Sequence, residues 1–398
     1  MHITHVFPKF KEVHGGAEPV IFNLLRCLGD QGIKNTLVTG GFPDSLGEQL
    51  DYRVELVTPP RALTPSFKNV LLAAFANLTS TAILPFFFPR QTDVVCFHTE
   101  TVVPALALYK VLRRRQPAIY FCYQPPRFAY DTGAETSRSG GLVGRLVPLF
   151  AAVYRPFDRA AVKKTHSVFT FSTGYGKWIE RIYGIEGVKV IPPGIQRPEK
   201  VPPLPPAIAK ALEGKGPVLC FTGKLTPWKN VDRLINITGL LRRKFPDIAC
   251  LVVGNGPSLG ALKEQVARMD LSDNILFPGY VGPGEVFSYY DVADLFVILE
   301  QNISFGLCLV EANSSGVPAM AFKAGGPLDI IEDGKNGFLI PPDENDQEIA
   351  KRIGNILKSS ETLSGMKKHS LEIAARFTWE RFATRFVNLA ESISHGKV

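Results

Sequence analysis

Metal-site and disulfide patterns are missing from this sequence of 398 residues. Its six cysteines are scattered and form no C-x-x-C pair, and its seven histidines form no cluster at metal-ligand spacing. Most of the cysteines lie in apolar runs such as VVCFH and VLCFTG, where cysteine behaves as a small buried hydrophobic residue. We therefore expect no disulfide framework, no zinc site and a reducing compartment. The six are Cys27, Cys96, Cys122, Cys220, Cys250 and Cys308.

A secretory signal is also missing, because MHITHVFPKF contains no basic segment followed by an apolar stretch. The sequence thus predicts a cytoplasmic protein. Residues 67–90 are largely apolar but are interrupted by Asn69 and Asn77 and closed by Pro85 and Pro89, whereas a spanning helix needs about 20 predominantly apolar residues. Two interpretations stay open: a helix lying in the membrane interface, which would make the protein peripheral to the membrane, or an internal helix packed on a sheet.

Positive charge is concentrated in the first half of the chain. Residues 1–200 carry 24 Lys and Arg against 15 Asp and Glu, a balance of +9, and the remainder carries 21 against 22. This balance is typical of a protein that binds a negatively charged partner, such as a membrane surface or a phosphorylated acceptor. It equally fits a role in solubility alone. The aromatic and basic residues are not interleaved as in RNA-binding modules, so we expect no nucleic-acid partner.

Short apolar runs alternate with longer amphipathic stretches, a pattern that predicts parallel β-sheets with crossover helices. The predicted strands of the first half are residues 2–7, 35–40, 93–98, 118–123 and 167–172. Those of the second half are residues 217–223, 248–254, 274–279, 295–299 and 317–322. We therefore predict an α/β protein with two Rossmann-like domains.

The domain boundary is indicated by the segment VIPPGIQRPEKVPPLPP at 190–206, whose seven prolines favour an extended connector. We place an N-terminal domain at 1–195 and a C-terminal domain at 196–376. The remaining residues, 377–398, have apolar side chains at helical spacing and are able to pack back on the first domain.

Three loops carry residues suited to anionic ligands. Gly15 and Gly16 precede a predicted helix, where free N–H groups attract anions. After a strand of the second domain come Lys224 and Lys229, whose ammonium groups suit a diphosphate. The turn Ser304-Phe305-Gly306 opens a helix whose first amides, at Leu307 and Cys308, suit phosphate oxygens, and Glu311 within this helix suits the hydroxyls of a ribose. Two glycine-containing loops, 325–327 and 333–337, follow.

In order along the chain, HGGAE, GKLTPWKNVDRLI, SFGLCLVEANSSGVPAMAF and DGKNGFLI resemble the motifs of the retaining glycosyltransferase family 4. The resemblance covers nearly the whole chain. It implies a GT-B fold, in which two Rossmann-like domains face a central cleft. It also implies a metal-independent enzyme without a cofactor, with a nucleotide-sugar donor in the C-terminal domain and an acceptor in the N-terminal one.

The resemblance assigns roles to single residues. Gly16 would meet the donor phosphates or the transferred sugar, and His98 matches the active-site histidine. Lys224, where the family usually has Arg, and Lys229 would face the diphosphate, so we expect His98, Lys224 and Lys229 to be catalytic. Glu311 matches the second glutamate of the E-x7-E motif and would bind the ribose.

The first glutamate of that motif is replaced by Ile303. In the family this glutamate contacts hydroxyls of the donor sugar, so its replacement puts the donor in question. Glu300 is the nearest acid and lies three residues too early to match. A protein of the same fold that binds nucleotide sugars without catalysis is the alternative that this replacement favours.

A narrower resemblance links FCYQPPRFAYD, with the later PFDRAAVKK, to mannosyltransferases that build bacterial polysaccharides and O-antigens. Tyr123 and Gln124 depart from that pattern. On this resemblance Arg127 and Tyr130 are expected to bind the acceptor, a saccharide or a polyprenyl-linked saccharide. GDP-mannose is the expected donor, followed by UDP-hexoses, and the expected role is hexose transfer in cell-surface polysaccharide biosynthesis.

Overall fold

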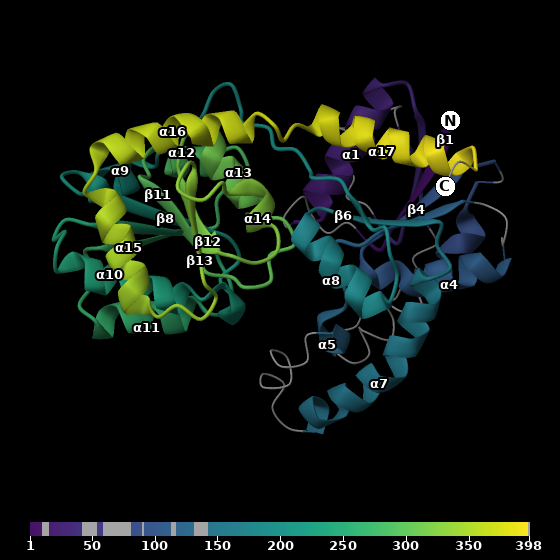
Figure 1. Ribbon diagram of the computed structural model, residues 1–398, viewed down its shortest axis with the longest axis horizontal. Helices are drawn as coiled ribbons and strands as arrows, with labels where there is room; N and C mark the ends of the chain where they lie inside the picture. Colours follow the sequence, from purple (N-terminus) through teal and green to yellow (C-terminus); the bar gives the residue numbers. More distant parts are fainter. Residues whose placement is uncertain are drawn as a thin grey trace. The chain divides into compact units, whose positions relative to one another are not determined.

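Parallel β-strands with helices on both faces build two compact units in the computed structural model (Figure 1). The structure describes residues 1–9, 16–41, 54–58, 81–89, 91–112, 117–130 and 142–396. Unit 1 comprises residues 1–194 and 379–398, and unit 2 comprises residues 195–378. The predicted α/β architecture with two parallel sheets is confirmed.

Unit 1 is built on a parallel sheet whose described strands lie in the order β3-β2-β1-β4-β5-β6-β7. The strands are β1 (His2–Phe7), β2 (Lys34–Thr39), β3 (Val54–Val57), β4 (Val94–His98), β5 (Ala118–Phe121), β6 (Ser167–Thr170) and β7 (Lys189–Val190). The helices are α1 (Glu18–Asp30), η3 (Leu84–Phe87), η4 (Glu100–Val102), α4 (Val103–Leu112), α5 (Arg127–Tyr130), α7 (Leu142–Val162), α8 (Thr173–Tyr183) and α17 (Trp379–Ser394). The order reverses direction between β1 and β4, which is the topological switch point of a doubly wound sheet.

Unit 2 repeats this topology with the strand order β10-β9-β8-β11-β12-β13. The strands are β8 (Val218–Thr222), β9 (Ala249–Val253), β10 (Ile275–Gly279), β11 (Leu295–Ile298), β12 (Ala319–Phe322) and β13 (Gly337–Ile340). The helices are α9 (Pro206–Leu212), η5 (Pro227–Lys229), α10 (Val231–Arg242), α11 (Leu259–Arg268), α12 (Val286–Asp291), α13 (Leu307–Ser314), α14 (Pro327–Ile330), α15 (Asp346–Leu357) and α16 (Ser360–Ala374). Its switch point lies between β8 and β11.

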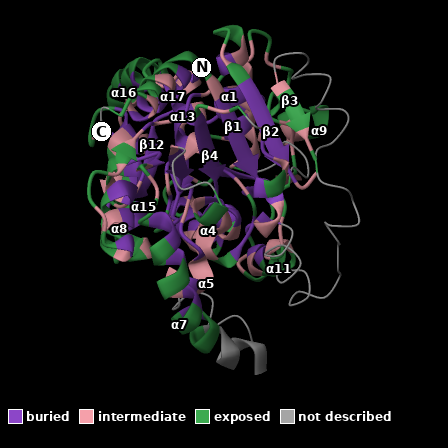
Figure 2. Cartoon of the chain, turned by 90° about the vertical axis from the view of Figure 1, so that its right-hand side faces the viewer, coloured by how far each residue is buried: buried purple, intermediate pink, exposed green. Residues whose placement is uncertain are grey.

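The central strands are buried on both faces, which explains their continuous apolar sequences. Every residue of β4 is buried, and so is every residue of β8 (Figure 2 shows the buried strands of unit 1). The strands β3, β7 and β13 are absent from the sequence-based prediction. In β3 the residues are exposed or half-buried, so VELV lacks the apolar run of its neighbours.

The C-terminal helix α17 belongs to unit 1 and packs on its sheet. The Phe386 ring lies 5.8 Å from the His5 ring and 5.6 Å from the Phe169 ring, and Phe382 lies 6.1 Å from Phe121. The chain leaves unit 2 after residue 378, and α17 begins at the next residue, Trp379.

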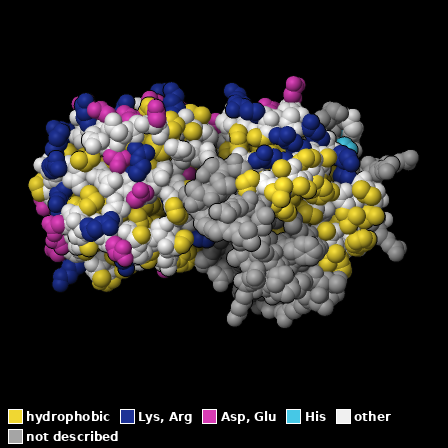
Figure 3. All heavy atoms as spheres, turned by 90° about the horizontal axis from the view of Figure 1, so that it is seen from below, with side chains coloured by type: hydrophobic (Ala, Val, Ile, Leu, Met, Phe, Trp, Pro, Cys, Tyr) yellow, Lys and Arg dark blue, Asp and Glu magenta, His cyan; other side chains and the backbone are white. Residues whose placement is uncertain are grey.

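In the described residues no helix is long and apolar enough to cross a membrane. Most of the predicted interfacial segment, residues 67–80 and 90, lies outside the described residues; within 81–89 the Phe86 side chain is 66% exposed. Figure 3 shows hydrophobic side chains gathered beside Lys and Arg on one face of unit 1.

Candidate functional site

The connections that follow β8 and β11 meet at the switch point of unit 2. Lys229 follows β8 and its ammonium group forms an ion pair with Glu300, which follows β11 and is only 6% exposed. Next to this pair, Asn230 Nδ2 donates to the carbonyl of Leu299 at 2.6 Å. Because ligands of doubly wound sheets bind outside the carboxyl ends of the strands at the switch point, Lys229 lies where such a ligand is expected.

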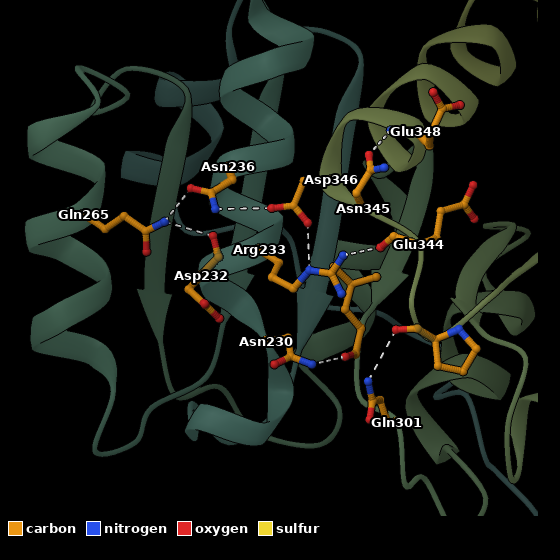
Figure 4. A network of polar contacts seen from close by, with 12 residues as sticks. Asn230, Asp232, Arg233, Asn236, Gln265, Gln301, Glu344, Asn345, Asp346 and Glu348 are labelled. Carbon is orange, nitrogen blue, oxygen red and sulfur yellow. Dashed lines mark hydrogen bonds and ion pairs between the residues drawn. The ribbon is translucent and has the colours of Figure 1, made fainter.

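A polar network holds the N-terminal part of α10 beside this site (Figure 4). Arg233 Nε donates to Asp346 Oδ1 at 2.7 Å, and Arg233 Nη2 donates to the carbonyl of Glu344 at 2.6 Å. Asn236 Nδ2 reaches Asp346 Oδ2 at 3.3 Å, and Gln265 Nε2 donates to Asn236 Oδ1 at 2.8 Å. The helix α10, which follows the Lys229 turn, is thereby anchored to α15 and α11.

The helix α13 begins at the same edge of the sheet, with Gly306 at its N-cap and a φ of 101°. A side chain there would lie 2.8 Å from Leu309 Cδ1, so the turn requires glycine. The first amides of an α-helix have no partner within the helix and carry partial positive charge. Burial raises the pKa of the Cys308 thiol to about 12; Lys229 opposes this rise, and Glu311 and Glu300 add to it, so these groups lie together.

Glu311 ends a short chain of hydrogen bonds. The Tyr290 hydroxyl donates to Glu311 Oε2 at 3.1 Å and lies 2.7 Å from the Thr222 hydroxyl at the end of β8. Burial raises the pKa of the Glu311 carboxyl, and the hydrogen bond from Tyr290 opposes this rise. Tyr290 thus holds one carboxylate oxygen in place, and the carboxylate retains lone pairs for the hydroxyls of a ligand.

Ile303 is 6% exposed and lies at the start of the turn that leads into α13. Its carbonyl accepts a hydrogen bond from the Gly326 amide at 2.9 Å. A side chain on Gly325 would lie 2.4 Å from the same carbonyl, and one on Gly326 would lie 2.0 Å from the Phe305 carbonyl. The predicted loop at 325–327 therefore serves as a platform on which the 303–306 turn packs.

The side chains of the remaining predicted residues of unit 2 differ in how far they are buried. The Lys224 side chain is exposed. Phe305 is 2% exposed and its ring packs on Phe377 at 5.5 Å, so only its backbone is available to a ligand. Ser304 and Leu307 are half-buried beside Gly306.

Two glycines that sequence reasoning did not single out shape the same edge. A side chain on Gly254, after β9, would lie 1.9 Å from the Gly223 carbonyl, and one on Gly256 would lie 2.3 Å from the Leu225 carbonyl. The Leu225 amide also donates to the Asn255 carbonyl at 2.9 Å. The G-x-G after a strand in VVGNGP was the available signal.

In unit 1 the structure places His98 inside a buried chain of side chains, where it is 0% exposed. His98 Nε2 lies 3.0 Å from His5 Nδ1, and His98 Nδ1 lies 3.1 Å from the Tyr123 hydroxyl. His5 Nε2 lies 3.3 Å from Asn35 Oδ1. Burial lowers the pKa of His98 well below its usual range, with a further contribution from His5. Burial also lowers the pKa of His5 to about 3, so both rings are neutral near pH 7.

The direction of this chain follows from its Asn35 end. Asn35 Nδ2 donates to the Ile33 carbonyl at 2.9 Å, which orients Oδ1 toward His5 as an acceptor. A neutral His5 must then carry its proton on Nε2, and its Nδ1 accepts from His98 Nε2. His98 Nδ1 is left as the acceptor for the Tyr123 hydroxyl proton. Both nitrogens of His98 are therefore engaged in hydrogen bonds. Because the Tyr123 hydroxyl donates its proton to His98, its oxygen can only accept a hydrogen bond from a ligand.

Cys96 joins the two histidines in one group. The ligand atoms of His5, Cys96 and His98 lie within 4.8 Å of one another, and all three residues are buried. Among the described residues this is the group able to hold a metal ion. His5 escaped sequence reasoning because a histidine within a largely apolar strand such as HITHVF is more often a satisfied core residue.

The two segments of the narrower resemblance come together in unit 1. Arg155 Nε, on α7, donates to the Ala129 carbonyl of α5 at 2.5 Å. The Tyr130 hydroxyl lies near Asp158, a carboxyl that is 0% exposed; burial raises the pKa of Asp158 to about 6, and the nearby hydroxyls of Tyr130 and Tyr183 oppose this rise. Arg127 lies near Glu100 and partly offsets the raised pKa that burial gives that carboxyl.

Gly16 is exposed just before α1, and a side chain added to it would meet no atom within 4 Å. The other glycine of the predicted pair, Gly15, lies outside the described residues.

Two family descriptions match the chain, one on each unit. Residues 14–197 match Glycosyltransferase Family 4, and residues 207–372 match Glycosyl transferases group 1. Among solved structures, the Anabaena protein Alr3699/HepE in complex with UDP aligns with a TM-score of 0.72 at 19% identity, over 98% of this chain and 100% of that one. This similarity shows the GT-B fold.

Curated relatives share about half of their length with this chain. The D-inositol 3-phosphate glycosyltransferase of Jonesia denitrificans is 28% identical over 219 residues, which are 52% of this chain and 51% of the relative. The GDP-mannose-dependent alpha-(1-6)-phosphatidylinositol monomannoside mannosyltransferase of Mycolicibacterium smegmatis is 28% identical over 215 residues, which are 51% of this chain and 55% of the relative. With both units matched, the chain belongs to glycosyltransferase family 4 and has the GT-B fold.

Proposed function

We propose that the protein is a glycosyltransferase that transfers a hexose from a nucleoside-diphosphate sugar to a saccharide or lipid-linked acceptor in cell-surface polysaccharide biosynthesis. The observation that carries this proposal is the meeting of Lys229, the N-terminus of α13 and Glu311 at the switch point of unit 2. A cation and helix amides suit a diphosphate, and a carboxylate suits ribose hydroxyls.

In the proposed reaction the bond between the sugar anomeric carbon and the diphosphate oxygen breaks, and a bond to the acceptor oxygen forms on the same face of the sugar. The acceptor hydroxyl proton passes to the departing diphosphate. Lys229 and the α13 amides would stabilise the negative charge that develops there, so the proposed reaction requires neither a metal nor a cofactor. Lys224, exposed after β8, would add to the positive potential.

In unit 1, His98 would act through Tyr123, because its own ring nitrogens face His5 and Tyr123. The Tyr123 oxygen would accept a hydrogen bond from a substrate hydroxyl. Arg127 would bind the acceptor, and Tyr130, whose hydroxyl lies near Asp158, would support the α5 segment that carries Arg127. Gly15 and Gly16 would border the transferred sugar.

GDP-mannose is the proposed donor, supported by the mannosyltransferase relative of Mycolicibacterium smegmatis. A UDP-hexose is the alternative, supported by the UDP complex of the Anabaena protein. Ile303 offers an apolar surface where the family has a glutamate, so a sugar that needs a carboxylate there would bind less well than its deoxy counterpart. We place the protein in the cytoplasm, at the inner face of a membrane.

The test is turnover of a panel of GDP-, UDP- and ADP-sugars with saccharide and polyprenyl-linked acceptors, followed by release of the nucleoside diphosphate. We expect one donor to be consumed, with retention of the anomeric configuration in the product. Replacing Ile303 with glutamate should raise the preference for the hexose over its deoxy form. A chain that binds a donor tightly and turns over none would instead be a non-catalytic nucleotide-sugar-binding protein.

A further inference from the structure

The helix α7 of unit 1 has its apolar side chains facing solvent and its acid facing inward. Leu149 is 66% exposed, Phe150 50%, Val153 71% and Phe157 44%, and we call these four residues the α7 apolar face. Asp158, on the same helix, is 0% exposed. A helix of a globular protein ordinarily shows the opposite arrangement, with polar residues outward.

The α7 apolar face is continuous. At 3.6 residues per turn its four residues fall within an arc of about 100° around the helix axis. Four further exposed residues on the solvent side of α7 are also uncharged: Pro148, Ala152, Pro156 and Ala160. Exposed segments of α7 are visible in Figure 2. Single exposed hydrophobic residues are common on soluble proteins. A contiguous apolar patch is rare and marks an interaction site.

The opposite side of α7 is firmly packed, so the helix is a fixed element of unit 1. Tyr154 is 9% exposed and its ring lies 5.1 Å from Phe128. The Phe150 ring lies 5.4 Å from Phe128 and is thereby held at the border between the core and the solvent. Exposure of the apolar face is therefore a property of the packed helix.

The charges next to this face are positive. Arg159 is exposed on α7, and Lys163 and Lys164 are exposed just after the helix ends. Burial lowers the pKa of Lys110, on α4, and the nearby charge of Lys164 lowers it further. Among the exposed residues from Pro148 to Lys164 none is acidic. An apolar strip with cations at one end complements an anionic lipid surface, in which the acyl boundary takes the apolar side chains and the headgroups take the lysines.

We propose that the α7 apolar face, together with Arg159, Lys163 and Lys164, docks unit 1 onto an anionic bilayer surface. In choosing a bilayer as the partner we rely on the proposed function, whose lipid-linked acceptor would lie at a membrane. Docking would bring α5, whose Ala129 carbonyl accepts a hydrogen bond from Arg155 of α7, close to the lipid headgroups.

The test uses the full chain and co-sedimentation with vesicles of phosphatidylcholine alone or mixed with phosphatidylglycerol. The wild type should bind the mixed vesicles, and binding should weaken as salt rises. The double variant Leu149→Ser with Val153→Ser should lower binding by about tenfold or more. Leu371→Ser is the matched control, since Leu371 is 50% exposed on α16 of unit 2 and should leave binding unchanged.

A second double variant, Lys163→Gln with Lys164→Gln, separates the two parts of the surface. It should remove most of the preference for phosphatidylglycerol and most of the salt dependence, while weak binding through the apolar face persists. Nucleoside-diphosphate binding, measured for every variant, should match the wild type and so report on folding and on the site of unit 2.

Failure of the wild type to bind mixed vesicles, or full binding by the serine double variant, would overturn the docking proposal and leave the proposed function standing. A wild-type chain that self-associates in sedimentation velocity, with the serine variant monomeric and vesicle binding unchanged, would also overturn it in favour of a second copy of the chain. Vesicle binding without turnover of any donor would instead count against the proposed function.

Discussion

Lys229→Ala tests the site of unit 2 most sharply, because Lys229 has two partners to lose. One is Glu300, whose carboxylate is 6% exposed and pairs with the ammonium group. The other is the proposed diphosphate. Loss of one charge-assisted hydrogen bond costs about 1.5–3 kcal/mol, which weakens diphosphate binding by about 10- to 150-fold. Binding of the nucleoside, which lacks the diphosphate, should change little.

The Glu300 partner adds a second, opposite effect. In Lys229→Ala the Glu300 carboxylate loses its ammonium partner, stays at the site and repels a diphosphate. Adding Glu300→Gln to Lys229→Ala should therefore recover part of the lost affinity, and Glu300→Gln alone should tighten diphosphate binding because Lys229 is released from its ion pair. The same replacement should recover part of the stability lost in Lys229→Ala, since it removes a buried negative charge that Lys229 no longer balances.

Isothermal titration calorimetry with nucleosides and nucleoside diphosphates measures these differences directly. Lys335→Ala is the matched control: Lys335 also forms an ion pair, with Glu332 at 3.1 Å, but its side chain is 63% exposed. Its replacement should leave both affinities unchanged. Equal losses of nucleoside and diphosphate binding in Lys229→Ala would refute the role that we assign to Lys229.

Three further predictions concern the buried polar groups. Glu311→Gln should weaken a donor with an intact ribose by about tenfold or more and barely affect a 2′,3′-dideoxy donor; equal effects on both would make Glu311 a support of α13 alone. Because burial raises the pKa of Asp158 to about 6, the folded state holds that proton more tightly than the unfolded state, and its contribution to stability is lost as the pH rises from about 4 to about 6. The free energy of unfolding of Asp158→Asn relative to the wild type should therefore increase over that range by up to about 3 kcal/mol and level off above it, in denaturant titrations at each pH; a pH-independent difference would show that Asp158 does not titrate there. Nitrogen NMR should find His5 and His98 neutral between pH 5 and 8 with the proton on Nε2 in both, and in Asn35→Ala that tautomer should no longer be fixed; a titrating His98 would contradict the directed chain.

The α/β architecture could be predicted because the strands buried on both faces are continuous apolar runs. β4 and β8 illustrate this, since all of their residues are buried. β3 escaped prediction because its four residues are exposed or half-buried and form no apolar run, and β7 because it has only two residues. β13 escaped because its four residues follow a glycine-containing turn that dominates the local pattern. Propensity alone does not reveal strands whose place depends on neighbours distant in sequence.

Individual residues of the candidate site were visible in the sequence, and their relations were not. Lys229 and Glu311 follow from their loops, whereas the pairing of Lys229 with Glu300 depends on the return of the chain from β8 to β11 across the switch point. For His98, the sequence suggested a direct contact with a ligand that the structure does not place at its ring nitrogens. A histidine at the end of a strand suggests a ligand contact, but the sheet brings His5 and Tyr123 to its two nitrogens.

Hydrogen–deuterium exchange of the full chain with and without GDP or UDP tests the central claim, a nucleoside-diphosphate site in unit 2, most directly. One of the two ligands should protect amides of residues 223–230 and of residues 303–311, the loop after β8 and the turn into α13, while α16 exchanges as before. Protection confined to other segments, or no protection by either ligand at saturating concentration, would contradict the claim.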